Sequence, residues 1–248
     1  MTTALIILAF AGLWAGMQNT LAGGGSFVTL PALLLAGLTP LSANITSTVA
    51  LFPGQMASGY AGRSMVRGVG RLSFPWLVTI SLIGGMFGAV LLLITPPTMF
   101  ARMMPWLVLF ATLVFAWGSF LRKPVAEGRQ ISLPLLVAAQ FLIAVYGGYF
   151  GGGIGFLMMA ALSIAGQSAR NAGATKNALA AAMNASAVAL FALSSEVKWL
   201  EVAVLAASST VGYLLGVWVL RRVNEKWLRI GVVVLGVALT VGLFWRQF

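Results

Sequence analysis

Cysteine, histidine and aspartate are absent from this chain, and four glutamates are its only acidic residues. Without thiols or imidazoles it cannot form disulfides, thiolate or imidazole metal sites, or a nucleophile–histidine pair. The acidic residues lie in loops or near segment ends, at Glu127, Glu196, Glu201 and Glu225. No base is therefore placed for hydrolysis within a membrane, and we expect a protein that is not an enzyme and holds no metal and no cofactor.

Charge is also scarce, since 8% of the residues are charged and 60% are hydrophobic. A soluble domain carries about a quarter charged residues, so the composition predicts an integral membrane protein whose surroundings are the lipid bilayer. A net charge of +11 would suggest nucleic acid in a soluble protein. Here the Lys and Arg residues gather in short loops, as the positive-inside rule requires, and we expect no nucleic-acid partner.

Hydrophobic runs divide the chain into ten helical segments, eight long and two short. The first segment lacks the basic flank of a signal peptide and has an internal counterpart at 132–150, so we interpret it as a membrane span. The predicted class is an all-α integral membrane protein. Its predicted segments are 3–22, 26–38, 43–62, 72–94, 98–121, 132–150, 154–166, 171–194, 199–220 and 227–246.

The two halves of the chain resemble each other. The glycine triplet at 23–25 matches that at 151–153 with an offset of 128 residues, and "ANITST" (43–48) matches "AGATKN" (172–177) with an offset of 129. Further on the offset returns to 128, where Gly84 and Gly88 match Gly212 and Gly216. We therefore predict one transmembrane repeat at 1–121, a cytoplasmic linker at 122–131 and a second repeat at 132–248.

The distribution of basic residues predicts the topology. If all ten segments cross the membrane, the loops after the third, fifth, seventh and ninth segments share one side and hold 12 of the 15 Lys and Arg residues. If the two short segments only dip in and return, this asymmetry is lost. The positive-inside rule thus favours ten crossings, with both termini in the periplasm. Five crossings per half also invert the second repeat relative to the first.

The two short segments follow the glycine triplets. A helix of 13 residues covers about 20 Å, some 10 Å less than the hydrocarbon thickness, so one end of each must lie within the membrane beside protein or a wet cavity. Broken segments at matching positions of inverted halves indicate a transporter's substrate site. Close helix packing is the alternative reading of the triplets, and we favour it for Gly84, Gly88, Gly212 and Gly216.

Polar residues recur on the segments that follow. Asn44, Thr48 and Gln55 share one helix face, and the same spacing recurs in Gly173, Asn177 and Asn184. These amides indicate a lined path, with interhelical hydrogen bonding as the alternative. Lys176 is costly within a membrane unless it pairs with an anion or snorkels to the surface, and both readings stay open.

The stretches "AGGGSFVTLPALLLAGLTPLSANITST" and "FGGGIGFLMMAALSIAGQSARNAGATKN" resemble the paired signatures of the sulfite exporter TauE/SafE family. The resemblance covers nearly the whole chain. It implies a bacterial inner-membrane protein that transports sulfite or a small organosulfonate or carboxylate anion. Ser47 stands in the first copy where the second has Lys176, so charge pairing with an anion would be asymmetric.

These observations predict a secondary transporter that exports a small anion, sulfite or an organosulfur compound, by alternating access. A passive anion channel and a non-transporting scaffold subunit are the alternatives, and a homo-oligomer is compatible with each. The predicted substrate-binding residues are Gly23, Gly24, Gly25, Thr46, Thr48, Gln55, Gly151, Gly152, Gly153, Lys176, Asn177 and Asn184.

Overall fold

The computed structural model describes residues 2–21, 24–121, 132–219 and 225–247, and the predicted linker at 122–131 lies outside them. The first half contributes α1 (Thr2–Leu21), α2 (Ser26–Leu35), α3 (Pro40–Ala61), α4 (Phe74–Ile94) and α5 (Pro97–Ala116). The second contributes α6 (Leu133–Tyr149), α7 (Ile154–Ile164), α8 (Ala169–Phe191), α9 (Trp199–Val219) and α10 (Glu225–Gln247). A short 3₁₀ turn, η1 (Arg63–Met65), follows α3, and a π-helical turn, η2 (Trp117–Leu121), follows α5.

The prediction of an all-helical chain with ten segments is confirmed for the described residues. Both short helices follow the glycine loops, as expected. The segment predicted at 98–121 keeps α-helical hydrogen bonding only to Ala116 and then widens into η2. The segment predicted to start at 43 begins earlier, because Thr39 caps α3 by accepting a hydrogen bond from the Ser42 N–H and Pro40 fits the first helical turn.

Within the described residues, three helices are long and apolar enough to cross a membrane, at Thr3–Thr20, Phe74–Ile94 and Pro97–Ala116. Shorter apolar helices occupy Ser26–Leu35, Leu133–Tyr149, Trp199–Leu215 and Val233–Trp245. The central helices α3 and α8 are more polar, since α3 buries Ser42, Asn44 and Thr46 and α8 buries Lys176 and Asn184. Such side chains are tolerated where protein, rather than lipid, surrounds them.

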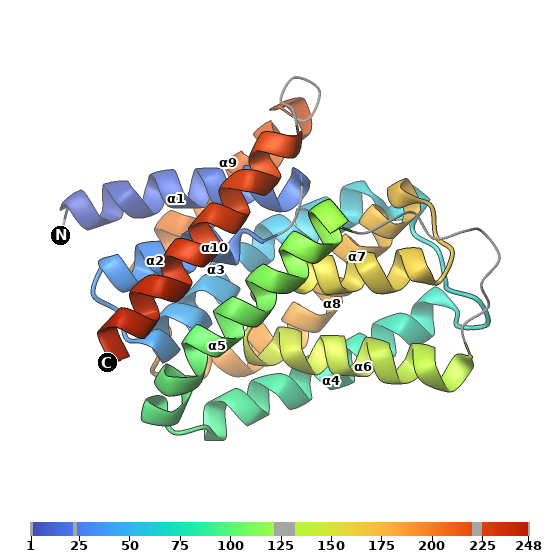
Figure 1. The fold of residues 1–248 in the computed structure, drawn as a ribbon, viewed down its shortest axis with the longest axis horizontal. Helices are drawn as coiled ribbons and strands as arrows, with labels where there is room; N and C mark the ends of the chain where they lie inside the picture. Colours follow the sequence, from blue (N-terminus) through green and yellow to red (C-terminus); the bar gives the residue numbers. More distant parts are fainter. Residues whose placement is uncertain (1, 22–23, 122–131, 220–224, 248) are drawn as a thin grey trace.

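Helices of the two halves pack against each other. The α1 helix packs along α9, α6 packs along α4, α3 contacts α8 at the centre, and α5 contacts α10 (Figure 1). A Cβ on Gly84 or Gly88 would collide with α6, and one on Gly212 would collide with the backbone of α1. The predicted packing role of these three glycines is confirmed; the contacts of Gly216 lie outside those described.

Connections gather at two ends of the molecule. The first turn of α1 and the last turn of α10 lie at the left of Figure 1, where the α4–α5 turn also lies. The α3–α4 and α7–α8 connections lie at the right. The α1–α2 and α6–α7 connections, by contrast, contain Gly24 and Gly151, which line a cavity inside the molecule.

Equivalent positions of the two halves adopt the same local structure. Gly37 ends α2 with φ +93°, and Gly166, at an offset of 129 residues, ends α7 with φ +89°. In both turns the next residue donates its N–H across the helix end, from Leu38 to the Leu33 carbonyl and from Gln167 to the Leu162 carbonyl. This closure favours glycine because the left-handed conformation is costly for other residues.

Candidate functional site

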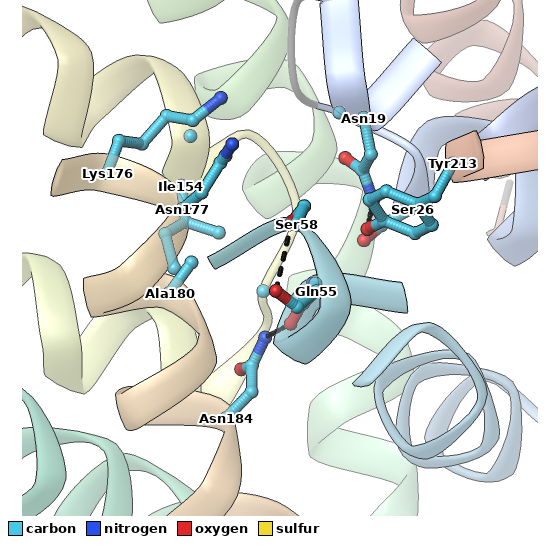
Figure 2. A pocket seen from close by; sticks show the side chains of 13 residues that line it. Asn19, Ser26, Gln55, Ser58, Ile154, Lys176, Asn177, Ala180, Asn184 and Tyr213 are labelled. Atoms are coloured by element: carbon cyan, nitrogen blue, oxygen red, sulfur yellow. Dashed lines mark hydrogen bonds between the residues drawn. The ribbon is translucent and has the colours of Figure 1, made fainter. Parts of the chain in front are cut away.

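A cavity lies between the N-terminal ends of the two short helices and the central helices (Figure 2). Residues of α1, α2, α3, α7, α8 and α9 and of both glycine loops surround it. Its lining residues are Asn19, Gly24, Ser26, Gln55, Ser58, Gly151, Ile154, Gly155, Lys176, Asn177, Ala180, Asn184 and Tyr213.

Both glycine loops reach this cavity in a conformation that favours glycine. Gly24 has φ +82° and Gly151 has φ +73°, both in the left-handed region, which side-chain-bearing residues rarely adopt. The loops turn the chain into α2 and α7, whose first residues, Ser26 and Ile154, line the cavity. A helix N-terminus carries a partial positive charge, so two such ends favour an anion in the space between them. At α2 the Gly25 N–H is already bonded to Asn19 Oδ1, and the Phe27 and Val28 N–H groups are bonded to loop carbonyls.

One face of α8 forms a wall of the cavity. Figure 2 shows Lys176, Asn177, Ala180 and Asn184 along this helix, facing Gln55 and Ser58 of α3. Lys176 is 6% exposed, whereas a snorkelling lysine would extend its ammonium into water. No hydrogen bond or ion pair of this ammonium occurs within the described residues. The cavity therefore contains a buried positive charge without a protein counter-ion, which is costly until an anion pairs with it.

Two amides join the central helices at equivalent positions of the halves. Asn184 Nδ2 donates a hydrogen bond to Gln55 Oε1 over 2.6 Å, and the two residues are 129 apart, the offset found in the sequence. The bond matches the alternative reading of these amides, interhelical hydrogen bonding, and both side chains also line the cavity. Asn184 Oδ1 is buried without a hydrogen-bond partner.

Four polar residues of the cavity were missed from the sequence: Asn19, Ser26, Ser58 and Tyr213. Asn19 Oδ1 accepts a hydrogen bond from the Gly25 N–H, and Asn19 Nδ2 donates to the Tyr213 hydroxyl, each over 2.8 Å. Ser58 stands three residues after Gln55 on the same helix face, a spacing that could have identified it. For Asn19 and Tyr213 no local pattern gave a signal, because they come from opposite ends of the chain.

Two predicted site residues, Thr46 and Thr48, are not among the residues that line the cavity, although the Thr48 hydroxyl lies next to Gly151, which lines it. Thr46 is fully buried and accepts a hydrogen bond from the Lys198 N–H over 3.2 Å. Thr175, which is 129 residues later in the sequence, likewise accepts one from the Arg67 N–H over 3.1 Å. Thr48 donates to the Asn44 carbonyl on its own helix over 2.9 Å. The Thr46 and Thr175 hydroxyls thus pair backbone N–H groups that lie outside the helices.

The remaining predicted glycines have other surroundings. Gly25 is the N-cap residue of α2, and a Cβ there would lie 2.6 Å from Asn19 Nδ2. Gly153 caps α7 with φ +74° and packs on Ala111. Gly152 lines a second, smaller cavity, together with Ser47 and Phe150. Gly23 lies outside the described residues. Of the predicted residues, Gly24, Gln55, Gly151, Lys176, Asn177 and Asn184 come together around the main cavity.

The chemistry of this lining suits binding. It combines one ammonium with amides, hydroxyls and helix N-termini, and no carboxylate occurs among its residues. Within the part of the chain that the structure describes, no group of three or more acidic or histidine side chains could hold a metal ion. Positive and hydrogen-bond-donating groups around a small space are the means by which proteins hold oxyanions.

Known proteins resemble this chain over nearly its full length. The probable membrane transporter protein YfcA of Escherichia coli K12 is 27% identical over 242 residues, covering 96% of this chain and 89% of that protein. A probable membrane transporter protein of Haemophilus influenzae is 28% identical over 245 residues, covering 98% and 95% of the two chains. The family model for the sulfite exporter TauE/SafE matches residues 8–243. The chain therefore belongs to the sulfite exporter TauE/SafE family of membrane transporters.

Proposed function

We propose that this protein is a secondary transporter that exports a small anion, sulfite or an organosulfur compound, across the bacterial inner membrane. The observation that carries the proposal is the buried, unpaired Lys176 in a cavity that two helix N-termini also face. The family model's description as a sulfite exporter supports the choice of anion. The relatives' names, probable membrane transporter proteins, support transport rather than catalysis.

The transport cycle that we propose is alternating access by two inverted five-segment repeats. Three structural correspondences support the repeat. The contact of α1 with α9 matches the contact of α6 with α4, with the two halves exchanged. Thr46 and Thr175 occupy equivalent positions, and each accepts an N–H from the loop of the opposite half. Gln55 and Asn184, also equivalent, bond directly to each other, as expected where a pseudo-two-fold axis passes between the halves.

Lys176 and the helix ends have distinct tasks in this proposal. The ammonium supplies the full charge that recruits the anion, and the partial positive charges at the starts of α2 and α7 favour its oxygens. The smaller cavity beside Ser47, the residue equivalent to Lys176, has no charged residue in its lining. We therefore place the anion at Lys176 and assign the smaller cavity to the closed side of the pathway.

Counterflow in proteoliposomes tests this function. Vesicles loaded with unlabelled sulfite should transiently accumulate labelled sulfite against its gradient, and flux should saturate with concentration. A passive channel would give flux without counterflow. A scaffold subunit would give no flux above that of empty vesicles. Either of these two results would contradict the proposal, and repeating the assay with thiosulfate, ethanesulfonate and acetate would identify the preferred class of anion.

A further inference from the structure

We propose that Tyr213 is a second anion-binding residue, whose hydroxyl proton Asn19 directs into the cavity. The inference rests on the proposed anion site and adds a residue and a positioning partner to it. Tyr213 lies on α9, and Asn19 lies near the end of α1. In Figure 2 both side chains lie across the cavity from Lys176 and Asn177.

The orientation of the Asn19 amide is fixed by a backbone group. The Gly25 N–H can only donate a hydrogen bond, so the amide atom facing it at 2.8 Å must be the Oδ1 oxygen. The Nδ2 group is therefore the one that faces the Tyr213 hydroxyl at 2.8 Å. Because Nδ2 can only donate, the Tyr213 oxygen accepts this bond and its own proton is left for another partner.

The Tyr213 hydroxyl donates no hydrogen bond among the described residues, where Asn19 Nδ2 is its donor. Because Tyr213 lines the cavity, an oxyanion bound there supplies an acceptor for this proton.

Comparison of the two halves indicates that the hydroxyl is not needed for packing. The Tyr213 ring fills the space above Gly54, where a Cβ would collide with it. At the equivalent place in the other half, Met183 fills the space beside Gly85 and Gly147. By the sequence offsets, the trio Asn19, Gly54 and Tyr213 corresponds to Gly147, Met183 and Gly85. An apolar side chain thus fills the equivalent space, and the tyrosine adds a donor on the cavity side.

The test removes the hydroxyl and keeps the ring. Tyr213→Phe should weaken the binding of sulfite or ethanesulfonate by about ten- to a hundredfold, the range for a hydrogen bond to a charged group. The melting temperature of the anion-free protein should stay nearly the same. Tyr149→Phe is the matched control, because the Tyr149 hydroxyl contacts Thr95 Oγ1 at 3.4 Å and does not line the cavity. Its affinity should equal that of the wild type.

A double-mutant cycle tests the positioning role of Asn19. Asn19→Leu should lower anion affinity more in the wild-type background than in the Tyr213→Phe background. In both it leaves the Gly25 N–H unpaired, but only in the wild type does it also release the tyrosine proton. Equal effects in both backgrounds would overturn that role. Wild-type affinity in Tyr213→Phe would overturn the inference while leaving the anion site intact. A wild-type protein that binds neither anion would instead remove the proposed function, and this inference with it.

Discussion

Replacing Lys176 by glutamine tests the central charge of the proposed site. The substitution keeps a polar side chain that donates hydrogen bonds but removes the positive charge. Lys176 is 6% exposed, and its ammonium makes no hydrogen bond or ion pair within the described residues. Loss of the charge should therefore have opposite effects on anion binding and on the stability of the empty protein.

The size of the binding effect follows from the burial. A hydrogen bond to a charged group contributes about 1.5–3 kcal/mol, and 1.4 kcal/mol corresponds to a tenfold change in affinity. Lys176→Gln should thus weaken sulfite binding by about ten- to a hundredfold. Lys176→Arg should keep part of the affinity, because the charge remains while its geometry changes. Lys198→Gln is the matched control: Lys198 is exposed and solvent screens its charge, so affinity should change less than about twofold.

Stability should change in the other direction. A buried charge without a partner costs free energy, so its removal should raise the melting temperature of the anion-free protein. Each 1 kcal/mol gained corresponds to about 2–4 °C for a chain of this size. Titration calorimetry in detergent and thermal unfolding with and without sulfite measure the two effects. Equal sulfite affinity in wild type and Lys176→Gln would refute the reasoning, and a lower melting temperature would show that the ammonium supports the fold.

Three further predictions concern two buried threonines, two glycines and the membrane topology. Thr46→Val and Thr175→Val should each destabilise the protein by about 1–3 kcal/mol, because each leaves a loop N–H unpaired, and neither should change anion affinity. A large loss of anion affinity in Thr46→Val but not in Thr175→Val would show that Thr46 belongs to the anion site. Gly153→Ala should lower the melting temperature, since φ is +74° and the new Cβ would lie 2.9 Å from Ala111 Cβ; Gly173→Ala, in a helix with open space around it, should not. Equal melting temperatures for these two variants would contradict the prediction that the positive φ of Gly153 requires glycine. Single cysteines at Thr2, Arg129 and Phe248 of this cysteine-free chain should label from the periplasm, the cytoplasm and the periplasm, respectively. Labelling of position 129 from the same side as either end would rule out ten crossings.

The sequence was informative about elements that depend on local chemistry. Hydrophobic runs located all ten helices, and the glycine triplets identified turns in which Gly24, Gly151 and Gly153 adopt positive φ. The repeat offset also paired Gln55 with Asn184, which the structure joins by a hydrogen bond. In each case the relevant signal lies within a short segment or in its internal copy.

Partners from distant helices could not be predicted in this way. Helical spacing assigned Thr46 to a polar face, but it could not indicate that the Lys198 N–H would occupy the hydroxyl. Asn19 and Tyr213 meet across 194 residues, because α1 packs along α9. Recognising that pair requires the packing of the two halves, which periodicity within one helix does not contain.

The packing of helices from one half against helices of the other constrains the order in which the chain can fold. Because α1 packs along α9, the glycine face of α1 lacks its main partner until almost the whole chain has been synthesised. By contrast, α4 and α6 are close in sequence and can pair early. A chain that stops after α8 would leave Gly12 and Gly16, which α9 covers in the full protein, without their partner surface. The surface of α1 is therefore completed only when the ninth helix is in place.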